Sequence, residues 1–77
     1  MNLVIDVGNT RTKLAVFDKN NIITVVIVEQ LEVLDCIKEL RKSYNQLHLA
    51  IVSSVGVIDQ AVVNYLSLHF NLLVLSH

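Results

Sequence analysis

One eight-residue segment, Asp6–Lys13, holds the side chains whose types and spacing could support chemistry. Asp6 ends an apolar run, and a carboxylate in such a place is costly unless another group pairs with it. A hydrated Mg²⁺ is a suitable partner, because this ion keeps several waters and binds through one or two carboxylates. Gly8 permits a tight turn whose backbone N–H groups can approach an anion closely. We therefore predict a phosphate-binding turn with Asp6 as the metal ligand, lined by Gly8, Asn9, Thr10 and Lys13.

The other residues of this segment also suit an anion site. Asn9 tolerates a left-handed conformation and offers an amide donor, whereas Thr10 and Thr12 add hydroxyl groups. Arg11 and Lys13 supply positive charge after the turn. An alternative interpretation stays open, because Asp-x-Gly-Asn is also ordinary β-hairpin chemistry. The sequence has neither the Gly-x-x-x-x-Gly-Lys of P-loops nor the Gly-x-Gly-x-x-Gly of dinucleotide-binding folds.

For the remaining reactive side chains we expect structural roles rather than catalytic ones. Cys36 lies beside the apolar stripe of a predicted helix, far in sequence from any histidine, so we expect an inert thiol. Ser54 is expected to cap the helix predicted over residues 58–69. The alternative is a contact of Ser53 and Ser54 with a ligand at the end of their strand. The three histidines lack the spacing of metal ligands (His48, His69, His77). The four aromatic residues are expected in the core (Phe17, Tyr44, Tyr65, Phe70). Six charged residues are expected on a solvated helix face (Glu29, Glu32, Lys38, Glu39, Arg41, Lys42).

These residues belong to a chain of 77 residues, which allows one domain at most. Its hydrophobic fraction is 53% and its mean hydropathy is +0.57. A body this small buries only about 60% of the surface that its unfolded chain exposes. The excess of apolar side chains predicts a piece of a larger fold or an obligate oligomer.

Composition also excludes several classes of protein. Six basic and seven acidic residues are scattered along the chain, so a nucleic-acid partner is not expected. The longest near-continuous apolar run, residues 22–28, is far shorter than the roughly 20 residues of a membrane-spanning helix. No signal peptide is visible, and one cysteine cannot form a disulfide within the chain. We expect a cytoplasmic protein without a membrane partner.

The pattern of apolar residues predicts the elements that position the segment. Residues 2–7, 12–17 and 22–28 alternate or run apolar between polar turns, which indicates an antiparallel meander. Leu31, Leu34, Ile37, Leu40 and Tyr44 recur at helical steps. A strand over residues 47–53, a helix over 58–69 and a strand over 72–75 complete the order β-β-β-α-β-α-β. We predict an α/β fold with a mixed sheet, and a chain ending on a strand leaves one sheet face without a helix.

Two segments of the chain resemble a known family. Asp6-x-Gly8-Asn9-Thr10-x-x-Lys13 is similar to the first motif of type III pantothenate kinases, members of the actin-like ATPase superfamily. Ile51-Val52-Ser53-Ser54-Val55 resembles the Ser-Ser-Val that ends the fourth strand in that family. The family usually continues with Val-Pro, whereas this chain has Gly56-Val57.

The resemblance implies a single ribonuclease-H-like domain over residues 1–77, the N-terminal nucleotide-binding part of a two-domain kinase. ATP and pantothenate would bind between the domains, and the γ-phosphoryl group would pass to pantothenate, the first step toward coenzyme A. Asp6 would face the metal, and Gly8, Asn9, Thr10 and Lys13 would line the phosphate site. Mg²⁺ and a monovalent cation, K⁺ or NH₄⁺, would be required, and the family forms homodimers.

The family's Gly-x-Asp-Arg pantothenate segment and its catalytic acidic residue would lie beyond residue 77, so no catalytic residue is assigned here. We expect the 77-residue chain to lack kinase turnover by itself. Two alternatives stay open: part of another actin-like kinase or ATPase, and a non-enzymatic domain that self-associates through an exposed sheet face.

Overall fold

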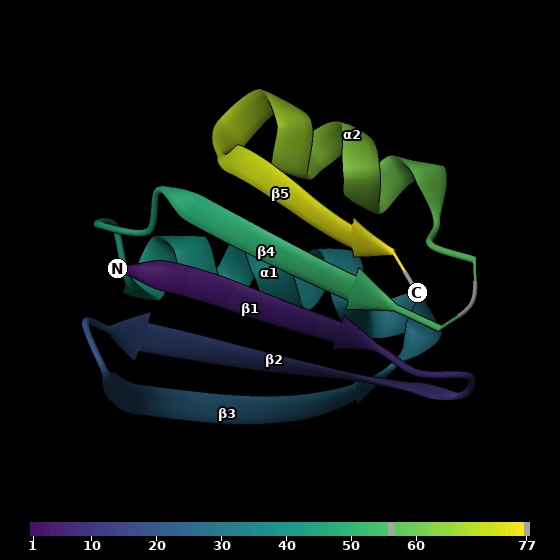
Figure 1. Cartoon of the computed structure of the whole chain (residues 1–77), viewed down its shortest axis with the longest axis horizontal. Coiled ribbons are helices and arrows are strands. Elements are labelled where there is room, and N and C mark those ends of the chain that lie inside the picture. The colour runs from purple at the N-terminus through teal and green to yellow at the C-terminus, as the bar shows by residue number, and fades with distance from the viewer. Residues whose placement is uncertain (56, 77) are drawn as a thin grey trace.

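The chain forms a five-stranded mixed sheet with two helices packed on one face (Figure 1). This computed structural model describes residues 1–55 and 57–76, so Gly56 and His77 lie outside the described residues. The observed order of elements confirms the predicted β-β-β-α-β-α-β and adds a 3₁₀ turn before the first helix. The elements are β1 (Asn2–Val7), β2 (Arg11–Asp18), β3 (Asn21–Glu29), η1 (Gln30–Glu32), α1 (Val33–Ser43), β4 (Leu49–Ser54), α2 (Gln60–His69) and β5 (Asn71–Ser76).

The strands lie in the order β3-β2-β1-β4-β5, which places β1 at the centre. β1 pairs antiparallel with β2, and β2 pairs antiparallel with β3, as the short turns between them require. β4 pairs parallel with β1 and with β5, and each of these pairings is reached through a helix. The carboxyl ends of β1 and β4 therefore meet at one edge of the sheet.

The core lies between the sheet and the helices. Alternate residues of β1, β2 and β4 point to this side, and α1 and α2 close it, with α1 drawn behind the sheet in Figure 1. Fully burying one Leu or Ile side chain stabilises a fold by about 1.5–3 kcal/mol. The largest fully buried aliphatic side chains are Leu3, Ile5, Leu14, Ile37 and Leu66.

The opposite side of the sheet, which we call the open face, carries no described element. Register places Val4, Ala15, Phe17, Val25 and Ile51 on it. Five larger aliphatic residues of the outer strands on this face are about half exposed: Ile22, Val25, Ile27, Leu73 and Leu75. The uncovered face expected from the sequence is therefore present, and Phe17 lies on it rather than in the core that was predicted for it.

Two predictions about the helices are wrong. Leu31 is 96% exposed, because residues 30–32 form the 3₁₀ turn and α1 begins only at Val33. Ser54 does not cap α2, because β4 extends through it and α2 begins at Gln60. The N-cap is Asp59, whose Oδ1 accepts a hydrogen bond from the Ala61 N–H at 3.0 Å.

Among residues 1–55 and 57–76, neither helix is long and apolar enough to cross a bilayer.

Candidate functional site

The turn between β1 and β2 is closed by a backbone hydrogen bond in which the Gly8 N–H donates to the Arg11 carbonyl at 2.9 Å. Gly8 is not in a left-handed conformation, and Lys19 is the one described non-glycine residue with a positive φ, 56°. Glycine is required at position 8 because there is no space for a Cβ atom. A Cβ atom added at Gly8 would lie 2.8 Å from the Arg11 carbonyl oxygen, closer than a real Cβ contact.

Asp6 and Lys13 lie opposite each other in the β1–β2 register, on the open face beside this turn. Ser53 of β4 flanks Asp6 on the other side. The side chains of Asp6 and Lys13 are exposed, and within the described part of the chain neither forms a hydrogen bond or an ion pair. The carboxylate and the ammonium group are thus both available to a ligand at the carboxyl end of β1, where open α/β sheets bind their ligands.

The turn also borders a pocket of about 450 Å³. Gly8 and Asn9 form one side of it, and Gln30 and Asp59 lie on the others. The structure therefore divides the predicted site. Asp6 and Lys13 lie on the open face, Gly8 and Asn9 reach the pocket, and Thr10 is exposed in the turn between them.

Gln30 is a site residue that the sequence reasoning missed. Its Nε2 donates to the Gly8 carbonyl oxygen at 2.7 Å, which ties the start of η1 to the β1–β2 turn. The two residues are 22 positions apart, so no local pattern could reveal the contact. Asp59 was also missed as a pocket residue, although an Asp just before an amphipathic helix is a recognisable N-cap signal.

Two residues of the segment do not contribute as expected. Thr12 is 0% exposed and points toward the helices, so its hydroxyl cannot reach a ligand at the turn. Its Oγ1 has no hydrogen-bond partner in the described part of the chain, and it borders a cavity of about 10 Å³. Arg11 is engaged by Glu29, with 3.6 Å between Nε and Oε1.

The donors around Asp6 fit Mg²⁺ only in its hydrated form. The described residues hold no group of three or more His, Cys, Asp or Glu side chains that could enclose a metal. A single exposed carboxylate suits an ion that keeps its waters and takes its other ligands from phosphate oxygens. Asp6 is the residue that would hold such an ion. The requirement for K⁺ or NH₄⁺ stays a prediction.

Cys36, His48 and His69 lie in surroundings that indicate a structural rather than a catalytic role. Cys36 is half-buried, and burial together with the nearby Glu32 carboxylate raises the pKa of its thiol. The ring Nδ1 of His48 lies 3.2 Å from the Gln46 carbonyl oxygen. The His69 ring packs on Tyr65 at 4.4 Å between centroids.

The mixed five-stranded sheet with its two helices is that of the N-terminal portion of an actin-like ATPase fold. The family model for type III pantothenate kinase matches residues 2–76, and the chain belongs to that family.

Two curated relatives agree with this assignment. The type III pantothenate kinase of Phocaeicola vulgatus is 38% identical over 78 residues, covering 100% of this chain and 31% of the relative. That of Christiangramia forsetii is 35% identical over 73 residues, covering 95% of this chain and 30% of the relative. The chain thus spans about a third of the length of these relatives.

Proposed function

We propose that this chain supplies the ATP-phosphate site of a type III pantothenate kinase, which transfers the γ-phosphoryl group of ATP to pantothenate for coenzyme A synthesis. Family membership supports the class of reaction. The observation that carries the assignment to residues is the strand register, which places Asp6 opposite Lys13. Both are exposed and without a partner in the described chain, beside a turn with room only for glycine.

Phosphoryl transfer is mostly positioning and charge neutralisation, so the roles of these residues follow from their chemistry. Lys13 would pair with phosphate oxygens, and the backbone N–H groups of Asn9 and Thr10 would orient them. Gly8 would contribute by allowing the tight turn, because its own N–H donates to the Arg11 carbonyl. Asp6 would hold the hydrated Mg²⁺ that arrives with ATP, which neutralises phosphate charge when bound. The residue that orients the pantothenate hydroxyl is not assigned within this chain.

Binding of MgATP to the chain tests the site directly. We expect amide NMR shifts in residues 6–13 on titration with MgATP, and Asp6→Asn should weaken binding by about tenfold or more, roughly 1.4 kcal/mol. Asp18→Asn is the matched control, because Asp18 is also an exposed strand carboxylate but lies at the end of β2 that is remote from the β1–β2 turn. Equal effects of the two substitutions would refute the assignment to Asp6.

Turnover is a separate question. In a coupled assay with Mg²⁺, K⁺ or NH₄⁺, ATP and pantothenate, the 77-residue chain should show none, because no group in it is assigned to the acceptor hydroxyl. Clear turnover would overturn this view. Phosphorylation of a different acceptor in a substrate panel would favour another actin-like kinase. Cytoplasmic location and a homodimer of the complete enzyme belong to the same proposal, and cell fractionation and sedimentation test them.

A second candidate, a self-associating domain, is favoured by the open face. Val25 and Ile27 of β3 and Leu73 of β5 are 48–60% exposed on one surface. Such a patch on a small protein commonly marks an interaction surface. Val25→Lys should then abolish any concentration-dependent mass in sedimentation equilibrium. Leu31→Lys, which adds the same charge at an exposed position in η1, should not. A monomer at millimolar concentration would exclude this candidate.

A further inference from the structure

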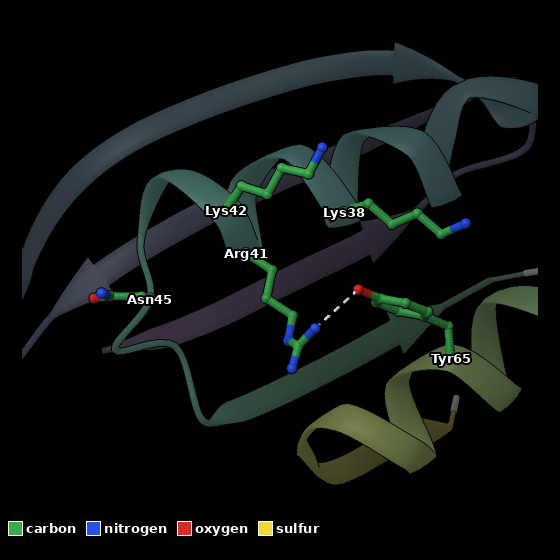
Figure 2. A pocket seen from close by; sticks show the side chains of 5 residues that line it. All are labelled: Lys38, Arg41, Lys42, Asn45 and Tyr65. Carbon is green, nitrogen blue, oxygen red and sulfur yellow. Dashed lines mark hydrogen bonds between the residues drawn. The ribbon is translucent and has the colours of Figure 1, made fainter.

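A second cluster of positive charge lies between the two helices, on residues that the proposed kinase site does not use. It surrounds a pocket of about 300 Å³, which we call the α1–α2 groove. The chain has six lysines and arginines, and three of them line this groove. The lining residues are Lys38, Arg41, Lys42 and Asn45, from α1 and the turn after it, and Tyr65 from α2 (Figure 2).

Arg41 and Tyr65 point toward each other across the groove in Figure 2. Arg41 Nη1 donates to the Tyr65 hydroxyl oxygen at 3.4 Å. Because this oxygen accepts, the hydroxyl proton stays free to be donated to a third group. The guanidinium also keeps further N–H donors in a planar fork, the geometry that matches phosphate oxygens. The two side chains therefore present several donors toward the same space.

The surrounding charge is only partly neutralised. Lys42 Nζ lies 3.7 Å from Glu39 Oε1, but neither Arg41 nor Lys38 pairs with a carboxylate within residues 1–55 and 57–76. Arg41 and Lys42 lie in the last turn of α1, where the helix dipole favours cations. Lys38 lies before that turn, and its ammonium is 5.6 Å from the centre of the Tyr65 ring. The dipole thus does not account for the third cation.

We propose that the α1–α2 groove binds the phosphate group of a small phosphorylated molecule. Arg41 and the Tyr65 hydroxyl bind its oxygens, and Lys38 and Lys42 supply the positive field. The groove volume falls at the lower end of the range of small-molecule pockets. The groove shares no lining residue with the pocket beside Gly8, so this site stands or falls independently of the proposed kinase function.

Residue-resolved NMR titration of the full chain with inorganic phosphate, at low and constant ionic strength, tests this inference. We expect saturable amide shifts in residues 38–45 and around Tyr65. Arg41→Gln should weaken binding about tenfold, whereas Arg41→Lys, which keeps the charge and loses the fork, and Tyr65→Phe should weaken it about threefold each. Lys19→Gln removes the same charge from the exposed β2–β3 turn and should leave the affinity unchanged.

Three outcomes separate the explanations. Shifts confined to residues 6–13 would place phosphate at the hairpin alone and would overturn the groove site. Equal weakening by Lys19→Gln and Arg41→Gln, or equal shifts with sodium chloride, would show a general charge effect and would also overturn it. Tighter binding of phosphate than of citrate at the groove would support a phosphate ligand, and the reverse order would refute that ligand class.

Discussion

Replacing Gly8 by alanine should disturb the turn that the proposed phosphate site depends on. The added Cβ would lie 2.8 Å from the Arg11 carbonyl oxygen, which is backbone and cannot rotate away. Relief of this contact requires the Arg11 carbonyl to move. That movement lengthens the 2.9 Å hydrogen bond from the Gly8 N–H that closes the turn.

The magnitude follows from two opposing terms. Overpacking of this kind costs about 1–3 kcal/mol, and Gly→Ala reduces the entropy of the unfolded chain, which returns about 0.4–1 kcal/mol. The midpoints of the two ranges give a net loss of unfolding free energy of about 1.3 kcal/mol. In a domain of this size that corresponds to a fall in Tm of roughly 5–10 °C.

Urea unfolding followed by far-UV circular dichroism measures this loss. Thr10→Ala is the control, because Thr10 is exposed in the same turn, and its effect should stay within about 0.5 kcal/mol. MgATP titration of the Gly8→Ala chain should also show weaker binding. A variant as stable as the original chain would refute the steric argument and show that the hairpin relaxes freely.

Three further predictions concern other features of the fold. Thr12→Val should raise the unfolding free energy by about 1 kcal/mol, because it removes a buried hydroxyl without a partner in the described chain. A lower unfolding free energy in urea would instead indicate a water bound to Oγ1. Lys19→Gly should raise the unfolding free energy by about 0.5 kcal/mol, because relief of the positive φ outweighs the entropy that glycine adds to the unfolded chain. A lower Tm of the Lys19→Gly variant would contradict this balance. Cys36 should react with Ellman's reagent more slowly at pH 8 than in the urea-unfolded chain. Burial and Glu32 raise its pKa and so lower its thiolate fraction, and the rate should keep rising at more alkaline pH; equal rates in the two states would refute the shielding.

The order of elements could be predicted because it depends on local pattern. The near-continuous apolar run over residues 2–7 and the alternation over residues 12–17 indicate strands, and the spacing of Ile37 and Leu40 indicates a helix. The exact start of α1 could not be predicted, because a single turn of 3₁₀ helix changes the side on which Leu31 lies. The prediction that Ser54 caps α2 failed for a similar reason, since pairing with β1 and β5 extends β4 through that residue.

The family, the fold class and the candidate residues Asp6, Gly8, Asn9, Thr10 and Lys13 follow from the sequence alone, because these depend on residue types at short spacings. Which of these residues share a surface depends on the packing of elements that are far apart in the chain. Strand register places Asp6 opposite Lys13. The hydrogen bond from Gln30 to Gly8 joins residues that are 22 positions apart in the sequence. The α1–α2 groove likewise depends on how two helices pack, which no pattern within either helix specifies.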